Sequence, residues 1–448
     1  MKDMDMIHGP LLSKMVVYAI PLVFSGLLQL LFNAADIAVV GRFTGASALA
    51  AVSAASPVSS LIVTLFTGLS VGANVVCAQY AGARSYQKLK ETIHTAVAIS
   101  AFAGIGLMLL GMACTDVLLK AMGTPEEILP LARLYLLIYF LGIPAMLLYN
   151  FGAAVLRAVG DTRRPMYFLT LSGILNVCLN LCFVIGFHMG VEGVAIATVI
   201  SQSIAAVMVI IVLGRDEGIC HLDVRQLKID KEKLGEMFRI GIPAGIQGAA
   251  FAVANLLIQS SVNSLGTAVM AASAVALNVD SFCFVAIDAL GQATISFAGQ
   301  NWGAGNDKRV DRIFWYGLGL GCMIGIVIGG ASVLLAPQIL GIYTRDPVVT
   351  RWGMEIMLIL SVFQFTNCTL NIPFNILRSM GRSIFPLVST IVCVCGLRIL
   401  WVYTVFRWFP TVTVLYLAWP VTKGVASITG IGYYLWLRKR NKKGAKKR

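Results

Sequence analysis

The feature that most constrains this chain is a series of long apolar stretches, separated by short polar breaks, along its whole length. Each stretch is about 20 residues or longer, the length an α-helix needs to cross the hydrocarbon core of a bilayer. The sequence therefore predicts an all-α integral membrane protein with twelve spans. They cover residues 15–40, 52–79, 92–119, 128–156, 165–187, 191–213, 236–263, 271–299, 312–340, 351–377, 384–407 and 411–437.

The composition excludes a soluble globular domain. Hydrophobic residues make up 58% of the 448 residues and charged residues 12%, whereas soluble domains carry about 25% charged residues. No small-residue cleavage site follows a short apolar run near the N-terminus, so we expect the first span to be retained. No Gly-Lys-Ser/Thr phosphate loop is present, and no nucleophile, base or metal set gathers in one place. We therefore expect neither an enzyme nor a resident cofactor.

Lysine and arginine are distributed unevenly between the polar breaks. If the N-terminus is cytoplasmic, the segments on that side hold 27 of these residues and the opposite segments hold six. Positive residues collect on the cytoplasmic side of membrane proteins, so both termini are predicted to be cytoplasmic and the chain to lie in the cell membrane. The basic tail, residues 438–448, is expected to contact anionic lipid head groups rather than nucleic acid.

The two halves of the sequence resemble each other at an offset of 221 to 222 residues. Each half holds six spans, and an even number returns the chain to its starting side, so the halves are predicted to be parallel repeats. The predicted domains are an N-lobe (1–213), a cytoplasmic linker (214–235), a C-lobe (236–437) and the basic tail. The matching pairs, in order, are Ile20-Pro21 with Ile242-Pro243, Asn33 with Asn255, Gln79-x-x-Gly82-Ala83 with Gln300-x-x-Gly303-Ala304, Asn150 with Asn371, Leu156-Arg157-x-x-Gly160 with Leu377-Arg378-x-x-Gly381, and Pro165 with Pro386.

Four polar residues fall at similar depth in the outer half of the first repeat. Asp36 lies late in span 1, and a charge inside a span is a functional candidate because its burial is costly. Asn176 and Asn180 lie on one face of span 5 because they are four residues apart, and Thr198 lies early in span 6. These oxygens predict a cation site that holds either a proton on Asp36 or a desolvated sodium ion.

The second repeat carries charges in other places: Asp280 and Asp288 in span 8, Arg398 in span 11 and Lys423 in span 12. Two interpretations stay open. The two acids and two bases pair as a structural network, or Asp280 faces a central cavity and attracts a cationic substrate. Further polar residues are candidates for the substrate cavity, namely Asn255, Gln364 and Asn367.

Two prolines and two glycine motifs occupy matched places. Pro21 and Pro243 remove a helical hydrogen bond from spans 1 and 7, so Pro21 is either a hinge or a static kink. The Gln-x-x-Gly-Ala motifs at 79–83 and 300–304 are predicted to end spans 2 and 8, because glycine favours the end of a helix.

The ordered set of Ile20-Pro21 with Asp36, the paired Gln-x-x-Gly-Ala motifs, Leu156-Arg157-Ala158-x-Gly160-Asp161 with Pro165, and Asn176-x-x-x-Asn180 resembles the multidrug and toxic compound extrusion (MATE) family of the MOP flippase superfamily. The resemblance covers about residues 10–440. It implies two six-helix lobes that form a V and a cation-driven antiport of organic compounds, often amphipathic cations.

The resemblance also implies site residues. An acid in span 1 with polar partners in spans 5 and 6 corresponds to Asp36, Asn176, Asn180 and Thr198, and a bend in span 1 corresponds to Pro21. The sequence departs from the family in the second half. Some members carry acids in spans 7 and 10 where this chain has Asn255, Asn367 and Asn371, which argues against a sodium site in the C-lobe.

The expected function is export of small organic, amphipathic cationic compounds by a monomer with alternating access. A proton or a sodium gradient would drive it, and the sequence leaves the choice open. The alternative is a lipid-linked oligosaccharide flippase of the same superfamily. Such a protein would hold a pyrophosphate with several basic residues, and here only Arg398 and Lys423 are available inside the spans.

Overall fold

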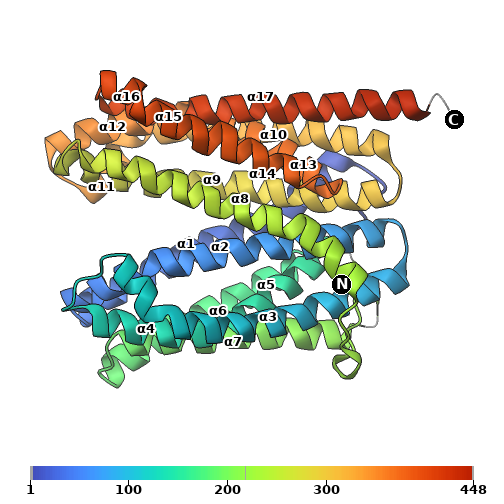
Figure 1. Cartoon of the computed structure of the whole chain (residues 1–448), viewed down its shortest axis with the longest axis horizontal. Coiled ribbons are helices and arrows are strands. Elements are labelled where there is room, and N and C mark those ends of the chain that lie inside the picture. Colours follow the sequence, from blue (N-terminus) through green and yellow to red (C-terminus); the bar gives the residue numbers. More distant parts are fainter. Residues whose placement is uncertain (1–3, 217, 446–448) are drawn as a thin grey trace. The chain divides into compact units, whose positions relative to one another are not determined.

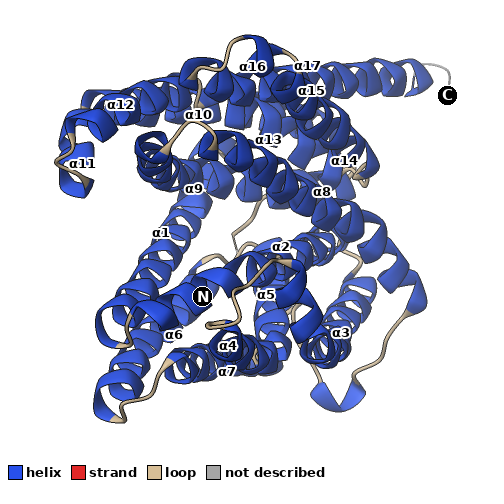
Figure 2. Ribbon diagram, turned by 60° about the vertical axis from the view of Figure 1, so that its left-hand side comes forward, coloured by secondary structure: helices blue, strands red, loops and turns tan. Residues whose placement is uncertain are grey.

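A computed structural model describes residues 4–216 and 218–445, with the side chains of 224 and 441–445 left out. Every regular element in this part of the chain is a helix (Figure 2). The three last residues and several side chains of the basic tail lie outside the described part. The predicted contact of that tail with lipid therefore stays a prediction.

The first half contains seven α-helices (Figure 1). The structure places them at α1 (Leu11–Phe43), α2 (Ala46–Gly82), α3 (Tyr86–Ala121), α4 (Leu129–Leu141), α5 (Ile143–Ala158), α6 (Arg163–Leu181) and α7 (Val191–Arg215). A π-helical segment, η1 (Cys182–Gly186), extends α6, and a short 3-10 turn, η2 (Val224–Gln226), follows α7.

The second half begins with α8 and ends with the long α17. Its helices are α8 (Lys231–Asn263), α9 (Thr267–Gly303), α10 (Asp307–Leu334), α11 (Ala336–Tyr343), α12 (Pro347–Val362), α13 (Phe365–Ser379), α14 (Ile384–Ser389), α15 (Leu397–Tyr403), α16 (Val405–Trp408) and α17 (Val412–Ala445). A π-helical segment, η3 (Thr390–Gly396), joins α14 to α15.

The predicted set of membrane spans is confirmed. Among the described residues, eleven helices are long and apolar enough to cross a membrane, and the bent pair α4–α5 makes a twelfth span. The bend of 44° was not expected from the sequence, which predicts one continuous span over 128–156. Pro144, in the first turn of α5, has no N–H to continue the hydrogen-bond ladder of α4, so the helix ends at Gly142.

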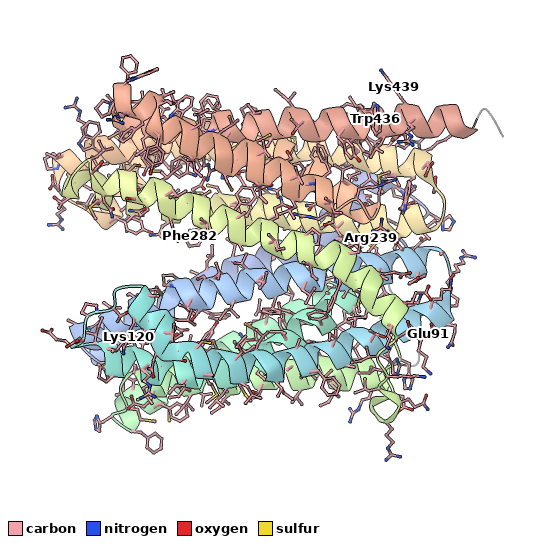
Figure 3. The ribbon with its side chains drawn as sticks, viewed as in Figure 1. Glu91, Lys120, Arg239, Phe282, Trp436 and Lys439 are labelled. Carbon is pink, nitrogen blue, oxygen red and sulfur yellow. The ribbon has the colours of Figure 1, made fainter. Side chains whose placement is uncertain are left out.

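The ends of the spans follow the sequence signals. Helix α2 ends at Gly82 and α9 ends at Gly303, as the two matched glycine motifs predict. Figure 3 shows Glu91 and Lys120 near opposite ends of α3. Helix α3 therefore carries its charges at its ends and leaves an apolar middle for the bilayer.

The chain divides into two compact units whose boundaries fall inside two helices. Unit 1 contains Ile20–Gly245 and the segment before His8, and unit 2 contains His8–Ala19 and the chain from Ile246 onward. The lobes predicted from the repeat divide the chain by sequence, at 213 and 236. By packing, each unit instead includes the first turns of the other half's leading helix. The boundaries lie next to Pro21 in α1 and Pro243 in α8, and both helices continue through their proline.

Glycines explain why the first turns of α8 belong to unit 1. Gly68 and Gly72 of α2 face Gly245 and Gly241 of α8, both pairs spaced four residues apart. A Cβ on any of the four would come within 3.0 Å of the other helix's backbone. Such paired small residues let two helices approach closely enough for dispersion forces to hold them together within a membrane.

A polar latch at one end of unit 1 ties the segment after α7 to α2 and α3. The ammonium of Lys233 donates to the Tyr80 hydroxyl at 2.9 Å, and that hydroxyl donates to Glu236 at 2.7 Å. The backbone N–H of Asp223 donates to His94 Nε2 at 3.1 Å. The predicted linker, residues 214–235, is therefore a folded segment with side-chain anchors.

Candidate functional site

Three helices of unit 1 bring the four predicted cation-site residues together. The Nδ2 of Asn180 in α6 donates to Asp36 Oδ1 in α1 at 2.5 Å, and it also approaches Asn176 Oδ1 at 3.3 Å. The Nδ2 of Asn176 in turn donates to the Thr198 hydroxyl in α7 at 3.4 Å. The sequence placed these groups at similar depth, and the structure joins them in one chain of hydrogen bonds.

Local packing explains why α1 lies so close to α6 here. A Cβ on Gly173 of α6 would overlap the ring of Phe32 of α1, so only glycine leaves room for this approach. Phe32 lies one turn before Asp36, and Gly173 lies two turns before Asn180. Nearby, the Ser172 hydroxyl donates to the carbonyl of Ser201 at 2.8 Å and fixes α6 against α7.

The cluster is enclosed by protein but is not sealed. Asn180 is 0% exposed and Asn176 is 6% exposed, whereas Asp36 and Thr198 are half-buried. Asp36 lies seven residues before the end of α1, which is about 10 Å along the helix axis. The group is therefore inside the span yet within reach of one membrane surface.

One atom of the cluster has an unused hydrogen-bonding capacity. The carbonyl oxygen of Asn180 is buried and has no hydrogen-bond partner. A buried acceptor without a partner costs about 1–3 kcal/mol, so it is a natural place for a cation or a donor to bind. Carboxylate, amide and hydroxyl oxygens are the ligands that hard cations take, and Asp36 is also a group that a single proton neutralises.

Two tyrosines near the cluster were not identified from the sequence. Tyr135 in α4 is within electrostatic range of Asp36, and its ring stacks on that of Tyr139 with centroids 6.1 Å apart. Their spacing of four residues places them on one helix face, but tyrosines in apolar spans are too common for that spacing to mark a site.

A small cavity adjoins the cluster at Thr198. Its volume is about 50 Å³, room for one or two water molecules at about 30 Å³ each. The lining residues are Tyr139, Gly142, Ile143, Met146, Thr198, Val199 and Gln202. The Thr198 hydroxyl thus connects the hydrogen-bonded cluster with a space that water can fill.

The predicted candidates in unit 2 gather around Arg398, which is 1% exposed. Its Nη1 donates to Asn255 Oδ1 at 2.8 Å and its Nε donates to the Thr422 hydroxyl at 3.3 Å. The guanidinium carbon lies 5.2 Å from the ring centroid of Trp419, so the indole face supplies a cation–π contact. Trp419 is a partner that the sequence did not reveal.

The two acids of unit 2 lie in different surroundings. Asp280 is within electrostatic range of Lys423 and is approached by the amide of Gln364. That amide is not aligned for an ordinary hydrogen bond, since Gln364 Nε2 has no partner. Asp288 accepts from Gln292 Nε2 at 2.7 Å and faces Arg378 instead.

The remaining cavity candidates differ in exposure. Asn367 is buried and donates to Gln364 Oε1 at 2.8 Å, whereas Asn255 is exposed. A further buried network centres on Arg378, which donates to Asn375 Oδ1 at 2.7 Å and to Gln247 Oε1 at 2.5 Å. The sequence identified Arg378 only as part of the repeat.

Comparison with known proteins places the fold in context. The family model described as MatE matches the chain twice, over residues 21–182 and 243–404. These two segments begin 222 residues apart, which is the offset of the internal repeat.

Two relatives in Bacillus subtilis (strain 168) cover most of the chain. The probable multidrug resistance protein YoeA is 28% identical over 95% of this chain and 94% of its own length. The probable multidrug resistance protein YpnP is 32% identical over 69% of each chain. A solved outward-facing structure of a multidrug resistance MATE family transporter of the MOP superfamily has a TM-score of 0.91 at 24% identity and covers 98% of both chains.

Proposed function

The chain belongs to the MatE family of multidrug transporters, and we propose that it is a secondary active exporter of amphipathic organic compounds. Family members are transporters and not enzymes, and the relatives' names describe multidrug resistance. A proton or a sodium gradient supplies the energy by antiport, and the lobes expose the substrate site alternately to each side. The cell membrane is the proposed location, with both termini in the cytoplasm.

The hydrogen-bonded chain of Asp36, Asn180, Asn176 and Thr198 is the observation that carries this proposal. It links α1, α6 and α7 inside unit 1 and contains one carboxylate and one buried acceptor without a partner. Charged groups inside spans are costly and persist where they serve ion or proton pathways. Its position inside unit 1 makes it sensitive to how α1 packs on α6.

The coupling mechanism follows from the charge of Asp36. A bound proton or sodium ion neutralises the carboxylate and competes with Asn180 for it. Loss of that hydrogen bond loosens α1 from α6, and α1 bends near Pro21, where it passes from one unit to the other. The cation drives transport because it binds the bent and straight states of α1 with different affinities.

Dye efflux from proteoliposomes with separately imposed gradients tests this function. Purified protein is reconstituted with ethidium inside, and an inward proton gradient or an inward sodium gradient is applied alone. We expect one of the two to accelerate efflux above the rate in protein-free vesicles. Efflux that neither gradient accelerates would contradict the proposal, and it would favour a carrier that moves substrate without ion coupling.

A further inference from the structure

The repeat places the polar cluster of unit 2 at the positions that the cation cluster occupies in unit 1. Arg398 follows Asn176 by 222 positions, and Trp419 follows Thr198 by 221. Lys423 follows Gln202, which lines the small cavity, by 221 positions. The contact of Asn176 with Thr198 in unit 1 therefore has its counterpart in the contact of Arg398 with Trp419.

The cluster in unit 2 has more positive than negative charge. Arg398 and Lys423 are within electrostatic range of each other, and Asp280 is the acid within range of Lys423. No ion pair within 4 Å joins Asp280 to either cation among the described residues. One positive charge is therefore left without a counter-charge inside a membrane-spanning bundle, where isolated charges are expensive.

The same cluster also has more donors than acceptors. Among the described residues, the Lys423 ammonium has no hydrogen-bond partner, and Arg398 donates only through Nη1 and Nε. Gln364, which is 1% exposed, has a buried Nε2 without a partner. Each of these groups can still donate, and each can be satisfied by an acceptor oxygen.

The depth of the cluster argues against a surface role. Arg398 lies ten residues before the end of its span at Trp408, and Lys423 lies eleven residues after the start of α17. Both are thus about 15 Å from the same end of the bundle, near the middle of a hydrocarbon core about 30 Å thick. Asn255 beside them is exposed, and an amide at this depth faces water-filled space rather than lipid.

We propose that Arg398 and Lys423, with Gln364 and Asn255, bind the anionic group of a transported compound. The compounds are amphipathic molecules that carry a carboxylate or a sulfonate, zwitterions included. Such a group balances the unmatched positive charge and accepts the unused hydrogen bonds, and a guanidinium recognises it by charge-assisted bonds. This inference rests on the proposed export function and names a substrate class within it.

A matched pair of dyes tests the inference. Tetramethylrhodamine is a zwitterion with a free carboxylate, and its methyl ester is a cation of nearly the same size. Fluorescence polarisation measures how each dye binds the purified protein in lipid nanodiscs of zwitterionic phosphatidylcholine. We expect the wild-type protein to bind the free acid more tightly than the ester.

Three variants report on the site. The preference for the free acid over the ester should fall about tenfold in Arg398→Gln, because a charge-assisted hydrogen bond is lost. Arg398→Lys keeps the positive charge and should keep most of the preference. Arg407→Gln removes an exposed arginine of α16 and should leave the preference unchanged.

The outcomes separate the two proposals. Equal binding of both dyes by the wild-type protein, or an equal loss of both in Arg398→Gln, would overturn the anion site and leave export intact. Failure to bind either dye would contradict the export function itself. If phosphatidylglycerol in the nanodiscs displaces both dyes and the variants do not change the preference, a lipid phosphate occupies the cluster and the substrate assignment is wrong. Should Arg398→Gln not fold, competition by benzoate against the free acid but not the ester in the wild-type protein decides the same question.

Discussion

The cluster around Asp36 in unit 1 and the cluster around Arg398 in unit 2 occupy equivalent places in a repeated fold and carry opposite charge. In unit 1 a carboxylate accepts from an amide, and a buried carbonyl oxygen has no partner. In unit 2 a guanidinium donates to an amide, and an ammonium has no partner. The comparison teaches that duplication preserved where polar groups meet, while substitution changed which ion each place suits.

The packing of the leading helices shows a second difference between the halves. In unit 1, α8 meets α2 through four glycines. The places in α9 that match Gly68 and Gly72, 221 residues on, hold Ala289 and Ala293, and both are buried. In unit 2 the first turns of α1 use a polar contact, in which Tyr18 donates to Ser296 at 2.8 Å.

The largest expected effect tests whether unit 1 alone carries the ion coupling. Asp36→Asn should reduce gradient-driven dye efflux about 100-fold or more, because the amide can neither take up a proton nor offer a charge to sodium. Efflux from proteoliposomes is the measurement. Asp116→Asn is the control, since Asp116 forms an exposed ion pair with Arg133 at 2.9 Å. Normal efflux by Asp36→Asn would show that both clusters are dispensable for coupling.

The next effect addresses the glycine seam. Gly72→Ala installs the residue that unit 2 has at the matching place, and its Cβ would overlap the carbonyl oxygen of Met237. We expect a loss of about 2 kcal/mol in stability, since close-packed backbones must separate. Thermal unfolding in detergent measures it, with Gly235→Ala in the same α8 as the control because nothing lies near its Cβ. An unchanged melting temperature for Gly72→Ala would mean that the seam is looser than it is drawn.

An intermediate effect probes the link between Asp36 and α6. Asn180→Ala removes the 2.5 Å hydrogen bond to Asp36 and the unused carbonyl. We expect the apparent affinity for the coupling cation to fall about tenfold, as for loss of one bond to a charged group. Efflux rate against cation concentration measures it. Asn278→Ala changes an exposed asparagine of α9 that bonds only its own helix, and it should behave as wild type.

The smallest effect converts part of unit 2 into the chemistry of unit 1. Lys423→Gln installs the residue found at Gln202 in the first repeat, and it leaves Arg398 in place. The preference for the free acid of the rhodamine pair should fall about threefold, because Lys423 interacts as a half-buried point charge rather than a planar fork. A larger loss than in Arg398→Gln would identify Lys423 as the main anchor for the anion.

Several features of this protein follow from the sequence alone. The twelve spans are readable because a bilayer demands about 20 apolar residues in a row, which is a local property. The repeat is readable because its matches keep a constant offset. The depth of Asp36, Asn176, Asn180 and Thr198 then follows from counting residues along each span.

The tertiary structure decided the rest, since it depends on residues far apart in the chain. Asn180 and Asp36 are 144 positions apart, and Arg398 and Asn255 are 143 apart. No local pattern announces that Gly173 admits Phe32, that Trp419 faces a guanidinium, or that Gly142 breaks a span. Hydropathy fixes which segments enter the membrane, but within it every helix is apolar, so only the detailed fit of side chains selects the neighbours.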